Sequence, residues 1–273
     1  MIFILGIDAL DYELVNKWDL INLKQLEYSK IQVPINKKVG LPLSSEVWAS
    51  FLVGEYVSIN LKSSSNFINV ILDILYAFNI DLYDGVGKKI QNILKTLGLS
   101  YPARIKDLNL RTFIDNSNAK EINAPYYSFD HSTINTLFNY NKGKISINQL
   151  IEKINLIYEK RKLQILNEVD DLNNIDVVFS YIHAIDILQH LLYDHISEIK
   201  KYYVDLDEYV AILKSKLNIK LNCPIFIIVS DHGFNFEIAN HSKWGYYSSN
   251  INLMPKPKKI TDFYKFLTSD NKY

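Results

Sequence analysis

Three apolar stretches of this chain each lead into an aspartate. The stretches and their aspartates are residues 2–7 with Asp8, residues 177–182 with Asp186, and residues 225–230 with Asp231. If the stretches are parallel strands of an open α/β sheet, their carboxyl ends lie at one edge, where such sheets bind ligands. The sequence therefore predicts that three carboxylates from distant parts of the chain converge on one rim.

Histidines accompany two of these aspartates. His190 follows Asp186 by four residues, which on a helix places both side chains on one face, about a turn apart. His232 directly follows Asp231, and Gly233 then supplies the backbone freedom for the turn that two adjacent ligands require. Both pairs can contribute to a metal site.

Oxygen and imidazole donors in this combination suit two divalent metal ions. His241, in a polar segment shortly after His232, can return to the same rim, and His183 is either a residue that orients a ligand or a buried or helix-capping histidine. A donor set of this kind favours zinc, with manganese as the alternative. Each residue also has an ordinary explanation, because an aspartate after a strand commonly caps the next helix and a loop histidine is commonly solvated.

Two adjacent serines stand at the predicted start of a helix. Residues 44–52 have helical periodicity, and Gly54 is placed to end the helix. Ser44 or Ser45 thus lies at the helix N-terminus, where serine is commonly a cap. The same position presents unpaired amides to a phosphate group, and a neighbouring metal would lower the pKa of a serine hydroxyl and make it a nucleophile. Both interpretations stay open on these residues alone.

Strands that alternate with helices must position these residues. The predicted helices outside the serine region span residues 67–78, 86–97, 145–169 and 196–217, with a further one from about residue 186. Such alternation is typical of a mostly parallel sheet covered by helices. We predict a single α/β domain over residues 1–273, with an irregular covering or cap region at about 60–145.

The composition excludes several functions. The chain has 273 residues, 48% of them hydrophobic, and its formal net charge of zero provides no field to attract nucleic acid or an anionic membrane. No apolar stretch reaches the roughly 20 residues of a membrane-spanning helix. The single cysteine, Cys223, is expected to be buried before the strand at 225–230. One cysteine and an N-terminus without a signal-peptide pattern predict a cytoplasmic protein.

The order in which these residues occur is more specific than any one of them. In chain order the pieces are Gly6-Ile7-Asp8-Ala9, the segment from Pro42 to Gly54, Asp186-Ile187-Leu188-Gln189-His190, Ser230-Asp231-His232-Gly233, and His241. This order resembles the alkaline phosphatase superfamily, and within it the type I phosphodiesterase and nucleotide pyrophosphatase branch. The resemblance implies a three-layer α/β sandwich around a mostly parallel sheet, in agreement with the alternation of strands and helices.

The resemblance also implies two metal ions, each held by three of these side chains. The implied ligands are Asp186, His190 and His241 for one metal, and Asp8, Asp231 and His232 for the other. Counted back from Gly54, Ser44 rather than Ser45 occupies the position of the family's nucleophile and would also contact the second metal.

The chain departs from this branch at several positions. Diesterase relatives usually carry threonine as nucleophile, and Ser44 is chemically equivalent but is also the choice of phosphatases and cofactor-independent phosphoglycerate mutases. The segment between His232 and His241 is short. An asparagine that helps bind the phosphoryl oxygen has no clear counterpart, Asn66 being the nearest. These departures leave the substrate open.

Two other hydrolase families fit less well. Sulfatases carry a proline and an arginine at fixed offsets after their nucleophile position, and neither residue follows Ser44 within four positions. Haloacid dehalogenase phosphatases have a second aspartate two residues after the first, where this chain has Leu10.

We predict a two-metal phosphoesterase that hydrolyses a phosphodiester or a nucleotide pyrophosphate through a phosphoserine intermediate on Ser44. Its partner would be a small phosphate ester or nucleotide. A phosphomonoesterase or phosphomutase is the alternative among enzymes. A catalytically inactive, metal-dependent phosphate- or nucleotide-binding protein is the alternative of another class. Nothing in the sequence indicates the oligomeric state.

Overall fold

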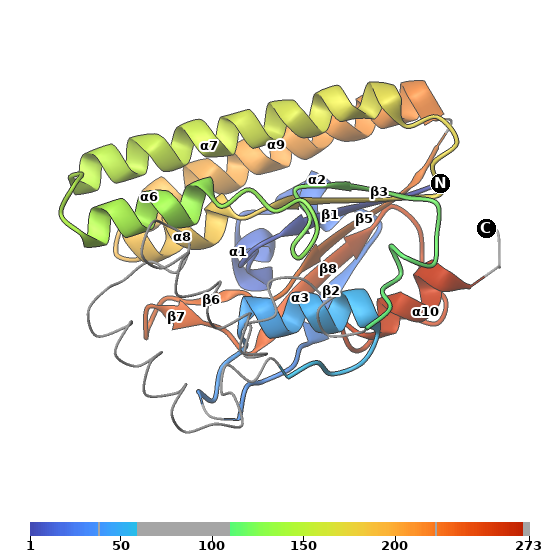
Figure 1. The fold of residues 1–273 in the computed structure, drawn as a ribbon, viewed down its shortest axis with the longest axis horizontal. Coiled ribbons are helices and arrows are strands. Elements are labelled where there is room, and N and C mark those ends of the chain that lie inside the picture. The colour runs from blue at the N-terminus through green and yellow to red at the C-terminus, as the bar shows by residue number, and fades with distance from the viewer. Residues whose placement is uncertain (38, 59–109, 222, 270–273) are drawn as a thin grey trace, which may run out of the picture. The chain divides into compact units, whose positions relative to one another are not determined.

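The computed structural model describes residues 1–37, 39–58, 110–221 and 223–269 (Figure 1). Met1–Val57 and Arg111–Tyr273 belong to one unit, which contains every strand and helix named below. The helices predicted at 67–78 and 86–97, together with Asn66 and the larger part of the predicted covering region, lie outside the described residues.

Strands and helices alternate along the described chain. The strands are β1 (Ile2–Ile7), β2 (Glu27–Gln32), β3 (Ala119–Ile122), β4 (Val177–Ile182), β5 (Ile225–Ser230), β6 (Phe234–Asn235), β7 (Asn240–His241) and β8 (Trp244–Ser249). The helices are α1 (Tyr12–Lys17), α2 (Ile21–Lys24), α3 (Ser44–Val53), α6 (Ser132–Asn141), α7 (Ile147–Glu168), α8 (Ala184–Leu192), α9 (Ile196–Leu221) and α10 (Asp262–Thr268), with the 3-10 turn η2 (Val169–Asp171) after α7.

The central sheet has six strands in the order β2-β8-β5-β1-β4-β3. Strand β1 pairs in parallel with both β4 and β5, and β3 pairs in parallel with β4. Strand β8 runs antiparallel to its neighbours β2 and β5. The prediction of an α/β fold with a mostly parallel sheet is therefore confirmed, and the three strands that lead to the aspartates lie side by side at its centre.

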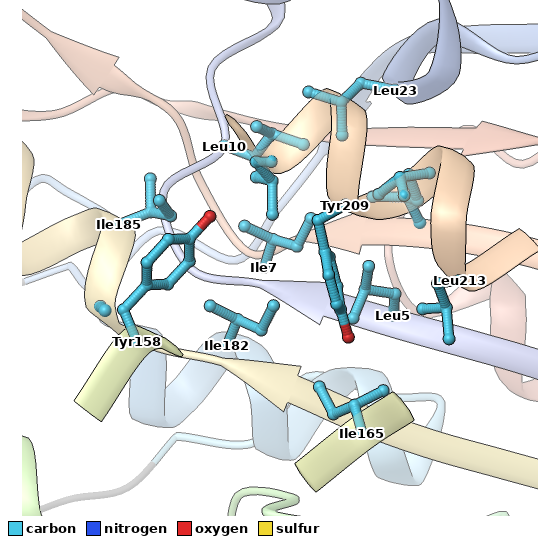
Figure 2. Close-up of a cluster of buried hydrophobic side chains, with 14 of the residues drawn as sticks. Leu5, Ile7, Leu10, Leu23, Tyr158, Ile165, Ile182, Ile185, Tyr209 and Leu213 are labelled. Carbon is cyan, nitrogen blue, oxygen red and sulfur yellow. The ribbon is translucent and has the colours of Figure 1, made fainter. Parts of the chain in front are cut away.

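These three strands are apolar because both of their faces are covered. Helices α7, α8 and α9 lie over one face, and α3 and α10 lie over the other (Figure 1). On the first face, side chains of α7 and α9 pack on alternate residues of β1 and β4, as Figure 2 shows for Tyr158, Tyr209, Leu5, Ile7 and Ile182. The rim that carries the aspartates is thus the carboxyl end of the central strands of a well-packed sandwich.

Helix α3 is fixed on the second face by aromatic side chains. The ring of Trp48 lies 5.8 Å from that of Phe179 and 5.1 Å from that of Tyr181, both on β4. Gly6 of β1 permits this approach, since a Cβ there would lie 2.9 Å from the Phe179 ring and 3.0 Å from the Trp48 ring. This packing places the first residue of α3, Ser44, at the carboxyl end of the sheet.

Several elements differ from the sequence-based expectations. Strands β2 and β8 were not predicted, and β3 and α6 lie in a range that was expected to be irregular. Cys223 is exposed and has a φ of 61°, so the prediction that it is buried is wrong; it lies in the turn between α9 and β5, where no packed layer covers it. Among the described helices, none has the length and apolar composition needed to cross a bilayer.

Candidate active site

The structure brings all seven predicted site residues to one edge of the sheet. Asp8 follows β1, Ser44 begins α3, Asp186 and His190 lie on α8, Asp231 and His232 follow β5, and His241 ends β7. Strand β7 pairs with β6 in a two-stranded hairpin that returns His241 to the rim. The chain segments that carry these residues are separated by more than half of the sequence, so the central sheet, α3, α8 and the β6–β7 hairpin together assemble them.

Two buried carboxylates and one imidazole form the innermost group. Asp8, Asp231 and His232 are fully buried. The Nε2 atom of His232 lies 3.4 Å from Asp8 Oδ1 and 3.4 Å from Asp231 Oδ2. The other oxygen of Asp231 accepts a hydrogen bond from the Ala9 amide at 3.3 Å, whereas Oδ2 has no hydrogen-bond partner among the described residues. An unpaired buried carboxylate oxygen is costly unless a cation or donor faces it.

Asp186 forms the outer group with two histidines. Its Oδ1 atom lies 3.5 Å from His190 Nε2 and 3.7 Å from His241 Nε2. This oxygen is inaccessible to solvent and, within the described ranges, accepts no hydrogen bond. The side chain of His190 is 37% exposed and forms the outer margin of the site.

The hydrogen bonds of two imidazoles determine which nitrogen carries the proton. His232 Nδ1 lies 3.0 Å from the Gly233 carbonyl, and His241 Nδ1 lies 3.0 Å from the Pro42 carbonyl. A carbonyl oxygen only accepts, so each Nδ1 carries the hydrogen and each Nε2 presents a lone pair to the carboxylates. The two rings stack at 3.8 Å with 13° between their planes. This arrangement is the one in which imidazoles bind metals.

Ser44, and not Ser45, faces this group. The Ser44 hydroxyl oxygen lies 3.0 Å from His232 Nε2 and 3.4 Å from Asp8 Oδ1. Ser45 instead offers its backbone carbonyl to the Tyr126 hydroxyl, at 2.6 Å. Leu43, the N-cap of α3, makes no side-chain cap hydrogen bond, so its side chain accepts from none of the amides in the first turn of α3.

The buried position of these groups shifts their pKa values away from the charged forms. Burial, reinforced by mutual repulsion between the carboxylates, raises the pKa of Asp8 to about 6, and burial raises that of Asp231 to about 6. Burial and the charges of Asp8 and Asp231 raise the pKa of Asp186 well above its ordinary value. Burial lowers the pKa of His190 and of His232 to about 4. The site therefore combines neutral imidazoles with carboxylates that need a positive charge.

His183 joins the site although its role stayed open in the sequence. Its Nε2 lies 3.5 Å from Asp8 Oδ2, and its Nδ1 lies 3.0 Å from the Thr133 hydroxyl. Tyr181 donates a hydrogen bond to the same Asp8 oxygen. The available signal was position, because His183 follows the last residue of β4 as Asp8 follows β1.

Gly233 is required by space and not by an unusual backbone angle. A Cβ at this position would lie 2.3 Å from Asp11 Oδ2, and the φ of Gly233 is not in the left-handed region. Asp11 caps α1 by accepting from the Leu14 amide and also accepts from the Phe234 amide at 3.2 Å. The expectation that Gly233 provides conformational freedom is therefore wrong. Glycine is needed there because the Asp11 carboxylate leaves no room for a Cβ.

The sequence profile of the type I phosphodiesterase / nucleotide pyrophosphatase family matches residues 87–246, more than half of the chain. The chain belongs to this family. The resemblance inferred from the order of the motifs is thereby confirmed. The matched range contains five of the seven predicted site residues, whereas Asp8 and Ser44 precede it.

Solved phosphodiesterase structures include similar folds at low identity. Mouse ectonucleotide pyrophosphatase/phosphodiesterase 5, as an inactive variant in complex with AMP, has 10% identity and a TM-score of 0.47, over 85% of this chain and 56% of that one. A second structure of the same mouse protein has 11% identity and a TM-score of 0.45, over 85% of this chain and 57% of that one. The chain thus spans little more than half the length of these proteins. No curated protein matches the sequence.

The residues of this phosphodiesterase-family site fit divalent cations. Three groups of side chains place their ligand atoms within 4.8 Å of one another: Asp8 with Asp231 and His232, Asp186 with His232 and His241, and Asp8 with His183 and Asp186. The unpaired oxygens of Asp186 and Asp231 and the Nε2 lone pairs of His232 and His241 point into these groups. A cation would supply the partner that these two carboxylate oxygens lack among the described residues.

We expect the affinity for a divalent cation to fall as the pH drops through about 6. Asp8 and Asp231, whose pKa values are raised to about 6, bind protons below that pH and must release them to bind a cation. The expected loss is up to about tenfold per pH unit for each proton released. Calorimetric titrations with zinc in buffers of different ionisation enthalpy measure this release, and an affinity that is constant between pH 5 and pH 8 would contradict the prediction.

Proposed function

We propose that the protein is a two-metal phosphoesterase that hydrolyses phosphodiester or nucleotide pyrophosphate bonds through a phosphoserine on Ser44. The family membership supports phosphodiester hydrolysis. The single observation that carries the rest is the position of the Ser44 hydroxyl, 3.0 Å from His232 Nε2 at the start of a helix. A nucleophile, a metal-ligand set and amides that can receive phosphoryl oxygens thus share one rim.

The chain's own residues would divide the work as follows. The first turn of α3 would receive phosphoryl oxygens, because unpaired amides and the helix dipole favour an anion at an N-terminus. Asp8, Asp231 and His232 would hold one cation, and Asp186, His190 and His241 the other, with zinc favoured and manganese as the alternative. When bound, the two cations would lower the pKa of the serine hydroxyl and offset negative charge that develops on the phosphoryl group.

Ser44 would then act by covalent catalysis. Its hydroxyl gives up its proton to solvent as Oγ attacks phosphorus and the new Oγ–P bond forms. The bond to the leaving oxygen breaks, and the alcohol or nucleotide fragment departs after its oxygen takes up a proton from solvent. Water attacks the phosphoserine in a second displacement, which releases the phosphate product and restores the hydroxyl. His183 would orient Asp8 from the side opposite to Ser44, since it faces the second oxygen of that carboxylate.

The proposed function is tested by measuring hydrolysis of a chromogenic phosphodiester and of the matching monoester. Metal-free protein is assayed on each substrate with zinc, with manganese and with a chelator. We expect metal-dependent cleavage of the diester, with a higher kcat/KM than for the monoester. Preferential cleavage of the monoester would replace the proposal with a phosphatase. Binding of phosphate or nucleotide without turnover of either substrate would show that the protein is an inactive binding protein.

A further inference from the structure

A buried network of hydrogen bonds lies beneath the candidate site and does not include any proposed ligand. The Gln189 amide nitrogen donates to the Ala9 carbonyl at 2.8 Å. The Tyr203 hydroxyl donates to Gln189 Oε1 at 3.1 Å and accepts from the Asp11 amide at 2.9 Å. Gln189 is 1% exposed and Tyr203 is 0% exposed. A buried amide with both ends paired in this way is held in one orientation.

The network acts on a strained turn. Ala9 has a φ of 57°, a left-handed conformation that non-glycine residues rarely adopt without support from the surrounding structure. Ala9 follows Asp8, and its amide donates to Asp231 Oδ1 at 3.3 Å. Its carbonyl is the acceptor of Gln189, with the Tyr203 hydroxyl 3.4 Å away. The turn at Ala9 thus follows Asp8 directly and supplies one hydrogen bond to Asp231.

The network also connects the two proposed ligand groups. Gln189 lies on α8 between Asp186 and His190, so the helix that presents two ligands of one group is tied by an amide to the turn that carries Asp8 of the other. Tyr203 extends the connection from α9 to the Asp11 amide. A shift of α8 along the sheet would change the separation of the ligand groups, and the Gln189 hydrogen bond opposes it.

We propose that Gln189 and Tyr203 are positioning residues that keep the two ligand groups in register. This inference rests on the proposed metal-dependent function. Metal centres are sensitive to the hydrogen bonds behind their ligands, and the loss of such bonds typically costs about 10- to 100-fold in metal affinity or activity. Here the hydrogen bonds hold the backbone and the helix that carry the ligands.

Cobalt(II) binding to the metal-free 273-residue chain tests the proposal, because the d–d absorption of cobalt reports ligand geometry without turnover. We expect Tyr203→Phe and Gln189→Met to weaken cobalt affinity about 10-fold or more and to alter the absorption spectrum. We also expect kcat for the diester to fall with little change in KM. Tyr209→Phe is the matched control. Tyr209 is a buried tyrosine on the same helix, and its hydroxyl donates to the Lys162 carbonyl at 3.3 Å, on α7.

Thermal unfolding of each metal-free variant separates positioning from general stability. If Tyr203→Phe and Gln189→Met unfold at lower temperature but bind cobalt with the affinity and spectrum of the wild type, the two residues are structural and the inference is wrong. An equal spectral change in Tyr209→Phe would also overturn it. If the wild type itself binds no cobalt, the metal centre and with it the proposed function are wrong, an outcome that is distinct from both of these.

Discussion

Replacement of Ser44 by alanine is expected to abolish phosphodiester turnover, with a fall in kcat of about a thousandfold or more. The substitution removes the oxygen that would form the bond to phosphorus, and no described side chain offers a second nucleophile at 3.0 Å from His232 Nε2. The carboxylates and imidazoles remain in place. Metal binding should therefore persist while chemistry stops, and parallel measurements of kcat and of zinc affinity check both parts.

Ser45→Ala is the control for this prediction. Ser45 contributes its backbone carbonyl to Tyr126, and this contact survives the substitution. Its kcat should stay within a few fold of the wild type, as expected for a surface substitution that breaks no essential contact. If the loss of activity follows Ser45 rather than Ser44, the nucleophile has been assigned to the wrong serine. If both variants retain activity, a covalent serine mechanism is excluded.

The second large effect is that of Asp231→Asn, which is expected to weaken metal binding but to stabilise the metal-free protein. We expect Asp231→Asn to reduce metal affinity more than about 100-fold, because a neutral amide replaces a charged ligand. The same substitution should stabilise the metal-free protein by about 1–3 kcal/mol at pH 7.5. Asp231 is fully buried, its Oδ2 is unpaired among the described residues, and burial raises its pKa from 3.8 to about 6.

The sign follows from proton linkage. A carboxyl group whose pKa is higher in the folded state stabilises the fold when protonated, and this contribution is lost as the pH rises from 3.8 toward about 6. The asparagine cannot ionise, and its amide can donate to the His232 Nε2 lone pair 3.4 Å from the present Oδ2. The stability difference between variant and wild type should therefore shrink as the pH is lowered from about 6 to about 4.

Asp207→Asn provides a control with the opposite expectation. Asp207 is also buried, but its oxygens accept from the Asn22 amide at 2.9 Å, from the Leu23 amide at 2.8 Å and from the Asn22 side chain at 2.8 Å. In Asp207→Asn an amide NH₂ group would face a donor that the carboxylate now accepts from, such as the Asn22 side-chain amide. The substitution should therefore destabilise the protein by about 1–3 kcal/mol. Chemical denaturation of the metal-free variants measures both, and a metal-free Asp231→Asn protein less stable than the wild type would show that the carboxylate is already paired.

The centre of the fold and the convergence of the candidate site residues on one rim could be predicted for a common reason. Strands β1, β4 and β5 are covered on both faces, so their sequences are uninterrupted apolar runs. Parallel strands end together, so a polar residue after each run indicates a shared rim. The helix that begins at Ser44 was recognisable from its periodicity and from Gly54, which ends it with a φ of 81°.

The outer strands had no such signal. Strand β2 buries only Ile31, and β8 buries two tyrosines and two serines, so neither shows the alternation of apolar and polar residues that identifies a strand. Strand β2 pairs with β8, and β8 also pairs with β5, so the residues that decide their conformation lie elsewhere in the chain. Tertiary context overrides the local sequence pattern in these two strands.

The network of Gln189 and Tyr203 was invisible for a related reason. Gln189 lies 180 residues from its acceptor, Ala9, and nothing in the local sequence of either residue indicates a partner. The tautomers of His232 and His241 depend on backbone carbonyls that only the folded chain brings near. The convergence of carboxylates and imidazoles could be predicted from sequence, but the orientation of these side chains and the hydrogen bonds behind them could not.

The pairing of β1 has a consequence for how the protein is made. β1 is the first strand of the chain, yet its register partners begin at Val177 on one side and Ile225 on the other. At synthesis rates of about 5–20 residues per second, an apolar first strand would wait roughly 10 seconds or longer before both neighbours exist. During that interval its two edges are open to other chains. Expression that outpaces chaperone capacity should therefore yield aggregates in which β1 is protected from hydrogen exchange by the wrong partner.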